Sequence, residues 1–180
     1  MNKSGFWSDA SRYGAIIGAV EILFMLLDRA VAGNSLLALL VSAANIVVFV
    51  WLLFRFTKQR SLLSDEGFGY GQSLGYILAM ALFAGVLVGG YEIVARNWLF
   101  TETYQELVKE QLVLMQKMAA QNPALSLSEL KSTLQKVTFS PIWVVVGSVF
   151  GMFIKALFFG LFVSFATRRE ESIFESSDQE

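Results

Sequence analysis

The chain contains four long stretches of almost uninterrupted hydrophobic residues, separated by short polar segments and by one longer one. A helix needs roughly 20 apolar residues to cross the hydrocarbon core of a bilayer, with a range of about 17 to 25. The pattern therefore predicts an all-α fold, in which residues 1–180 form a single membrane domain. We expect a four-helix bundle with spans over residues 13–32, 36–54, 74–94 and 141–165.

The first span has the shortest apolar run, and Glu21 interrupts it. Extending the run through Asp28 and Arg29 to Ala32 gives enough length if both charged side chains reach the far interface. A cleaved secretory signal is the competing interpretation, since Ala30-Val31-Ala32 has the small-x-small form of a cleavage site. The long, weakly basic leading region and the interrupting carboxylate favour a span.

The segment 97–140 is the one long polar interruption, and apolar residues recur in both of its halves at helical spacing. A break at Asn122-Pro123 separates the halves, and Ser126 with Glu129 has capping-box spacing at the start of the second. We predict an extramembrane helical hairpin between spans three and four whose apolar stripes bury each other. A partner-binding element and a hairpin on the lipid surface are the alternatives. The stripes consist of Tyr104, Leu107, Val108, Met115 and Met118, and of Leu127, Leu130, Leu134 and Val137.

The composition indicates a membrane protein, and the positions of the basic residues indicate its orientation in the membrane. Hydrophobic residues make up 55% of the chain and charged residues only 16%, whereas a soluble domain has about 25% charged residues. Cytoplasmic loops of membrane proteins carry an excess of Lys and Arg close to the spans. We therefore expect both termini, the loop after the second span and the tail 166–180 in the cytoplasm. The basic residues on that side are Lys3, Arg12, Arg55, Lys58, Arg60, Arg168 and Arg169.

The sequence contains no cysteine and no histidine. This excludes disulfides, Cys/His zinc sites, haem ligation by His and nucleophilic catalysis that uses a Cys or His. The acidic residues do not cluster at the spacing of metal ligands, and a net charge of -1 gives no reason to expect nucleic acid as a partner. We expect no metal, no cofactor and no enzymatic activity.

Small residues recur four positions apart in three of the predicted spans. In lipid, glycine lets two helix backbones approach closely. We expect most of these positions to pack helices within the bundle, and self-association is the alternative. The pairs are Gly14 and Gly18, Gly85 and Gly89, and Gly147 and Gly151.

Glu21 and Lys155 are the ionisable residues deepest inside predicted spans. Counted from the cytoplasmic ends of spans one and four, their depths differ by only about 3 Å at a rise of about 1.5 Å per residue. An ionised group at the bilayer centre costs about 2.5–3.5 kcal/mol, so opposite charges at matched depth predict an ion pair. Three interpretations stay open: the pair fixes helix register, it serves proton coupling or substrate binding, or the two groups do not meet.

The order of several motifs resembles that of an uncharacterised bacterial membrane family, domain of unknown function 4199, found mainly in Bacteroidota. The resemblance runs from about Tyr13 to Arg169, and it implies four spans, an inner-membrane location and a helical insertion before the fourth span. It assigns no activity and no residue role. The motifs are Tyr13-Gly14, the basic run from Arg55 to Arg60, Gly67-Phe68-Gly69-Tyr70-Gly71-Gln72-Ser73, the helix from Tyr104 to Met118, Phe139-Ser140-Pro141 and Arg168-Arg169.

Two functional hypotheses follow from these patterns. The first is a non-enzymatic inner-membrane protein that acts through self-assembly or a partner protein, based on the small-residue faces and the exposed hairpin. The second is a small transporter or channel subunit that uses Glu21 and Lys155 as intramembrane polar groups. The absence of proline inside a span and of an internal repeat favours the first, because transporters are commonly built from repeats and broken helices.

Overall fold

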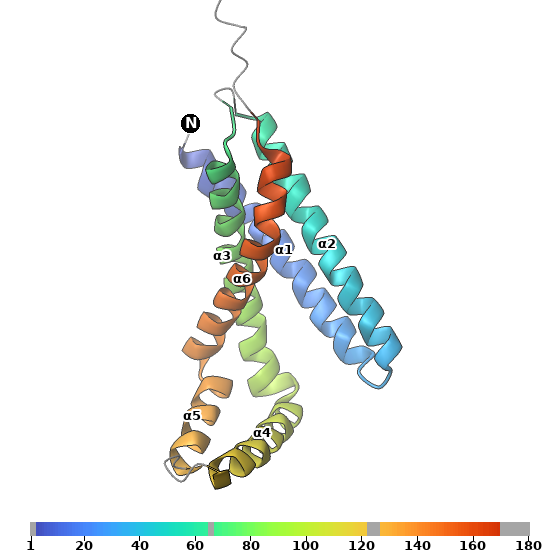
Figure 1. Cartoon of the computed structure of the whole chain (residues 1–180), viewed down its shortest axis with the longest axis vertical. Coiled ribbons are helices and arrows are strands. Elements are labelled where there is room, and N and C mark those ends of the chain that lie inside the picture. Colours follow the sequence, from blue (N-terminus) through green and yellow to red (C-terminus); the bar gives the residue numbers. More distant parts are fainter. Residues whose placement is uncertain (1–2, 65–66, 122–126, 170–180) are drawn as a thin grey trace, which may run out of the picture.

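The protein is described here by a computed structural model, which defines residues 3–64, 67–121 and 127–169. These residues form six α-helices and one π-helical turn (Figure 1). The elements are α1 (Lys3–Ala30), α2 (Ser35–Leu62), α3 (Tyr70–Val94), η1 (Ala95–Leu99), α4 (Thr101–Gln121), α5 (Leu127–Phe139) and α6 (Pro141–Thr167). The all-α fold class predicted from the sequence is confirmed.

Four helices are long and apolar enough to cross a membrane: Gly5–Ala30, Ser35–Leu62, Tyr70–Leu99 and Pro141–Thr167. The first three extend well beyond the apolar runs that predict them, since helical hydrogen bonding continues into the polar flanks. α2 shows how the sequence fixes one boundary. The side chain of Asn34 accepts hydrogen bonds from the amides of Leu36 and Leu37, and so satisfies backbone donors at the helix start.

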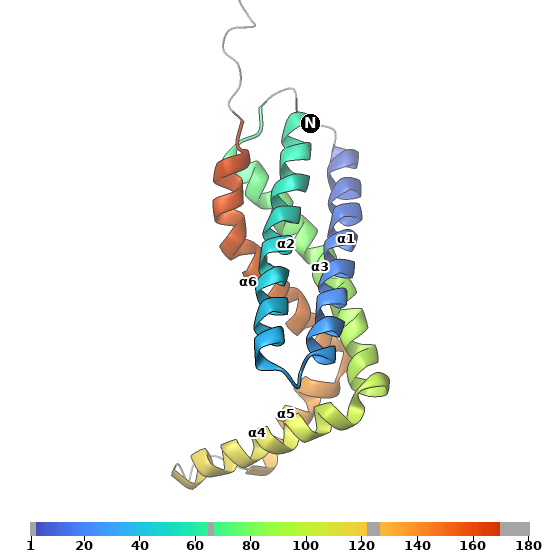
Figure 2. The same ribbon diagram turned by 90° about the vertical axis from the view of Figure 1, so that its right-hand side faces the viewer.

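The four spans are arranged as two pairs that cross, α1 with α2 and α3 with α6 (Figure 1). α3 lies at the centre and packs most extensively against α6 and α1. Away from the end that carries the N-terminus, the two pairs diverge, and Figure 2 shows α1 and α2 side by side along their length. The core lies where the pairs cross, and its fully buried side chains include Ile17, Phe49, Leu53, Tyr76, Ile77 and Met80.

Glycines account for the closest helix contacts in the bundle. A Cβ added at Gly14 would lie 2.5 Å from the carbonyl oxygen of Met80, and one added at Gly85 would lie 2.6 Å from Cα of Val149. Real Cβ atoms do not approach backbone this closely, so only glycine permits these α1–α3 and α3–α6 crossings. Gly18 and Gly89, one turn further along, pack against the same partner helices.

The end of the bundle with the N-terminus is held together by polar contacts. Arg60 of α2 pairs with Asp9 of α1 at 2.8 Å. The hydroxyls of Ser73 and Thr167 are 2.8 Å apart and link α3 to α6. The backbone of Phe68 exchanges two hydrogen bonds with Arg169. The divergence of the helix pairs is therefore confined to the opposite end.

At that opposite end the chain leaves the bundle through η1. The amide of Phe100, directly after η1, donates to the carbonyl of Ala95, one residue further back than in an α-helix. The chain then turns into α4. α4 runs across the end of the bundle, transverse to the spans, and α5 leads back to α6 (Figure 2).

The two hairpin helices bury their apolar stripes only in part. Val108 is buried, but Leu107 and Val137 are 46% and 47% exposed. A cavity of about 660 Å³ separates α4 from α5, with Leu112, Lys131 and Phe139 among its lining residues. The predicted hairpin is present, and the stripe residues whose side chains the structure describes are buried only in part. The predicted break at Asn122-Pro123, the Ser126 cap and residues 170–180 of the tail lie outside the described residues.

Candidate functional site

Glu21 of α1, Asn45 of α2 and Lys155 of α6 form a closed ring of polar contacts inside the bundle. The Lys155 ammonium donates to Glu21 Oε1 at 2.7 Å and to Asn45 Oδ1 at 2.6 Å. The Asn45 amide nitrogen donates to Glu21 Oε2 at 3.2 Å. The ring therefore connects three of the four spans through residues that are far apart in the sequence.

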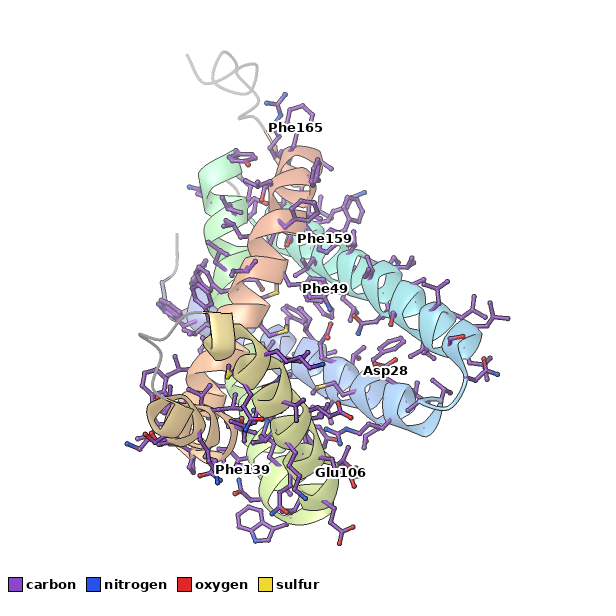
Figure 3. All side chains as sticks on the ribbon, turned by 60° about the horizontal axis from the view of Figure 1, so that its bottom comes forward. Asp28, Phe49, Glu106, Phe139, Phe159 and Phe165 are labelled. Carbon is purple, nitrogen blue, oxygen red and sulfur yellow. The ribbon has the colours of Figure 1, made fainter. Side chains whose placement is uncertain are left out.

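The surroundings of this ring provide partners for both charged side chains. The side chains of Glu21 and Lys155 are 11% and 23% exposed, and the Lys155 Nζ lies 4.3 Å from the ring centre of Phe49. An aromatic face attracts a cation through its quadrupole. Since Glu21 and Lys155 neutralise each other and Asn45 bonds to both, neither charge faces lipid alone. In Figure 3, which looks from the hairpin end, Phe49 lies between α2 and α6.

A partly open cavity of about 320 Å³ adjoins the ring between α1 and α2. Glu21, Asp28, Ser42 and Asn45 form its polar lining, and apolar side chains form the rest. Glu21 and Asp28 are seven residues apart, which places both carboxylates on one face of α1 about 10.5 Å apart along the axis. Figure 3 shows Asp28 on the side of α1 that faces α2. The apolar lining residues are Phe24, Met25, Val41 and Ile46.

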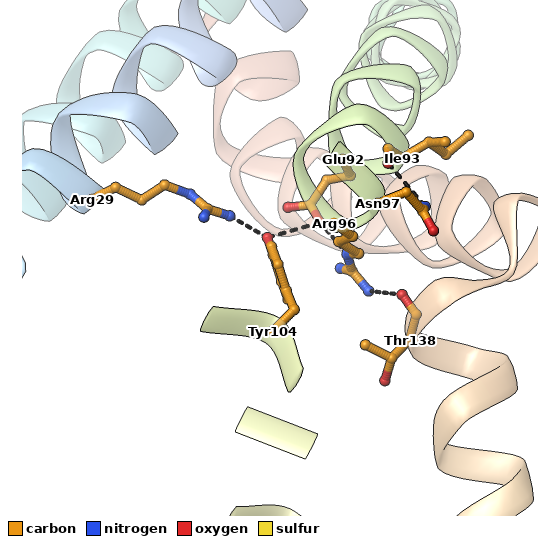
Figure 4. Close-up of polar contacts among 7 residues, drawn as sticks. All are labelled: Arg29, Glu92, Ile93, Arg96, Asn97, Tyr104 and Thr138. Carbon is orange, nitrogen blue, oxygen red and sulfur yellow. Dashed lines mark hydrogen bonds and ion pairs between the residues drawn. The ribbon is translucent and has the colours of Figure 1, made fainter. Parts of the chain in front are cut away.

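A second polar cluster ties α1 to the base of the hairpin (Figure 4). The Arg29 guanidinium donates to the Tyr104 hydroxyl and stacks on the rings of Phe100 and Tyr104 at 4.2 and 4.9 Å. The Tyr104 hydroxyl lies 3.4 Å from Glu92 Oε2, and this carboxylate also pairs with Arg96.

Arg96 in turn donates to the carbonyl of Thr138 at 3.2 Å, next to the start of α6. The cluster therefore fixes the outer ends of α1 and α3 and the end of α5 relative to one another. Burial raises the pKa of Tyr104 above its ordinary value of 10.0, and the nearby Glu92 carboxylate raises this pKa further.

The structure brings Glu21 and Lys155 together, as the matched depths predict. It also shows what sequence reasoning missed. Asn45 is not among the site residues predicted from the sequence, although its depth in the second span matches that of the pair. Glu92 is not among them either, yet it is 7% exposed and pairs with Arg96, a partner that the i,i+4 spacing could have revealed.

The three glycine pairs have different surroundings. Gly14 and Gly18 pack against α3, and Gly85 and Gly89 pack against α6, so these four positions serve the bundle interior. A Cβ added at Gly147 or Gly151 would meet nothing within 4 Å among the described residues. The third pair therefore lies on a surface of α6 that the described part of the chain does not cover.

No curated protein and no solved structure matches this chain. A protein family does match, and the match extends over residues 12–169, which include most of α1, the other three long helices and the hairpin. The ring and the cavity lie entirely within the matched region. The chain therefore belongs to the family described as "Protein of unknown function (DUF4199)".

Proposed function

We propose that this protein is a non-enzymatic integral protein of the bacterial inner membrane that acts through assembly with a second copy of itself. The observation that carries the proposal is the uncovered glycine pair on α6. Four of the six predicted packing glycines have a helix against them, but no described residue packs against Gly147 or Gly151. In lipid, helices associate where small residues let their backbones approach, so this surface suits another helix.

The residues around this pair support the same proposal. Phe150, Ile154 and Phe158 are 65%, 52% and 59% exposed, so the surface of α6 near the two glycines is apolar. An apolar helix surface with small residues suits the close packing of a neighbouring helix in lipid. The exposed hairpin offers a further surface outside the bilayer, which suits a partner protein.

The orientation belongs to the same proposal. Figure 1 shows the N-terminal end of α1, the last turns of α2 and the end of α6 together at one end of the bundle. That end carries Arg55, Lys58, Arg60 and Arg168, so the positive-inside rule assigns it to the cytoplasm. The hairpin then lies on the periplasmic side.

Crosslinked purification of the tagged protein from its own membranes, read by mass spectrometry, tests the proposal. We expect the protein itself to be the stoichiometric product. Native mass spectrometry in nanodiscs then tests whether the α6 glycines form the interface between copies. The wild type should be oligomeric, and the double variant Gly147→Val/Gly151→Val should be monomeric. Val146→Leu is the matched control, since Val146 is 51% exposed at the same depth on another side of α6.

A wild-type monomer, or a double glycine variant that assembles like the wild type, would overturn self-assembly through this surface. A stoichiometric second protein in place of a second copy would make the chain an accessory subunit. In that case the activity of the partner would define the biological role.

A second candidate function is a small transporter or channel subunit that uses Glu21 and Lys155. The specific observation in its favour is the ring that these residues form with Asn45 beside a polar-lined cavity. Flux measured in proteoliposomes with the wild type and with Glu21→Gln tests this role. Absence of flux in the wild type, or equal flux in both proteins, would count against it.

A further inference from the structure

We propose that the cavity between α1 and α2 binds a small organic cation, with a primary ammonium group near Asp28 and an apolar body between the helices. The first argument is charge. All the polar lining groups named above are oxygen-bearing: two carboxylates, one hydroxyl and one amide. Lys155 compensates Glu21, so the cavity keeps one uncompensated negative charge, that of Asp28.

The arrangement of Asp28 and its neighbour strengthens this argument. Among the described residues, no side chain pairs with or hydrogen-bonds to the Asp28 carboxylate. The adjacent Arg29 is directed away from the cavity, since its guanidinium bonds to Tyr104 and stacks on Phe100. A cationic ligand would therefore meet a carboxylate that the protein itself leaves uncompensated.

The inner end of the cavity shows which chemistry its oxygens accept. Glu21 and Asn45 already bind a primary alkylammonium, the side chain of Lys155, with an aromatic face beside it. A second ammonium at the outer end would find an oxygen acceptor in the carboxylate of Asp28. The walls formed by Phe24, Met25, Val41 and Ile46 suit the hydrocarbon part of such a molecule.

The volume limits the size of the ligand. Water occupies about 30 Å³ per molecule in the liquid, so a cavity of 320 Å³ holds about ten non-hydrogen atoms. Phenethylamine and its neutral isostere phenylethanol both fit this limit, and they differ in charge at one end. Comparing the two therefore separates recognition of a cation from simple filling of an apolar space.

The experiment measures saturable binding of both compounds to the full chain in nanodiscs, with empty nanodiscs to subtract partitioning into lipid. We expect phenethylamine to bind and phenylethanol not to. Asp28→Asn should weaken the amine by about tenfold to a hundredfold, since hydrogen bonds to charged groups contribute about 1.5–3 kcal/mol. Glu106→Gln is the matched control, because it removes an exposed carboxylate from the hairpin and should leave the affinity unchanged.

Equal binding of amine and alcohol would overturn the proposal and identify the cavity as a general apolar site. Unchanged affinity in Asp28→Asn, or no saturable binding of the amine, would overturn it as well. The inference goes beyond the assembly proposed above. Because binding is measured without transport and without assembly, its failure is distinguishable from failure of either function.

Discussion

Lys155 Nζ lies 2.7 Å from Glu21 Oε1, although 134 positions separate the two residues in the chain. Asn45 joins them from a third helix and hydrogen-bonds to both. This relationship ties α6, from one helix pair, to α1 and α2 of the other. Both the polar contacts in the ring and the glycine contacts at the crossings therefore stabilise the bundle.

Removing one partner of the ion pair should destabilise the protein more than removing both. Glu21→Gln leaves the Lys155 ammonium without its counter-ion inside a span, and we expect a loss of about 3 kcal/mol in the free energy of unfolding. Glu21→Gln/Lys155→Met removes both charges, and its stability should return to within about 1 kcal/mol of the wild type, because apolar replacement of a buried pair is often neutral. Denaturation in mixed micelles measures both values.

Two results would contradict this expectation. The single variant could be as stable as the wild type, which would mean that the Lys155 side chain finds water or headgroups instead. Alternatively, the double variant could be as unstable as the single one, which would show that the charge of Lys155 is not the source of the loss.

Replacing Gly85 with alanine should destabilise the isolated bundle, whereas replacing Gly147 with alanine should not. Gly85→Ala places a Cβ against the backbone at Val149, and overpacking of this kind costs about 1–3 kcal/mol. Gly147→Ala adds the same methyl group where no atom of the described residues lies within 4 Å, so its stability should stay within about 0.5 kcal/mol of the wild type. Unfolding of both variants under monomeric conditions measures the difference, and equal losses would argue against the α3–α6 crossing.

The pKa of Tyr104 should show whether this side chain is buried in the polar cluster at the base of the hairpin. Its pKa is raised by burial and by the Glu92 carboxylate, so the folded protein should form this phenolate above pH 10.0. Because the unfolded chain loses the same proton at about pH 10, this group's contribution to stability is fully present below that pH. The contribution is lost as the pH rises through the folded pKa.

The difference in phenolate absorbance between the wild type and Tyr104→Phe isolates this titration. Glu92→Gln removes a negative charge beside the hydroxyl and should lower the Tyr104 pKa. A wild-type difference curve centred at pH 10.0, unchanged by Glu92→Gln, would show that the tyrosine is solvated and does not belong to the cluster.

Single-cysteine labelling should determine the orientation, since the chain has no cysteine of its own. Gly33→Cys lies in the turn between α1 and α2, and we expect an impermeant reagent to label it in intact spheroplasts. Gln59→Cys is exposed near the opposite end of α2, and it should react only after permeabilisation. The reverse pattern would place both termini outside and overturn the assignment from basic residues.

Much of the architecture follows from the sequence because the bilayer imposes its requirements on each spanning segment separately. Four apolar runs of sufficient length predict four long helices whatever their partners, since a spanning segment must satisfy its own backbone hydrogen bonds. The same reasoning matched the depths of Glu21 and Lys155, because depth depends only on the number of residues from a helix end. The predicted all-α class and the helical insertion between spans three and four needed no tertiary information.

Tertiary structure decided which surfaces of these helices face each other. The spacing of the glycine pairs is the same in three spans. Only the crossing of α3 with α1 and α6 shows that Gly14 and Gly85 pack against another helix, whereas Gly147 meets no helix in the described part of the chain. The place of Asn45 in the ring and the cavity next to Asp28 likewise depend on how α1 and α2 are rotated. Rotation about a helix axis is set by packing against other helices, and uniformly apolar spans carry little periodic signal to predict it.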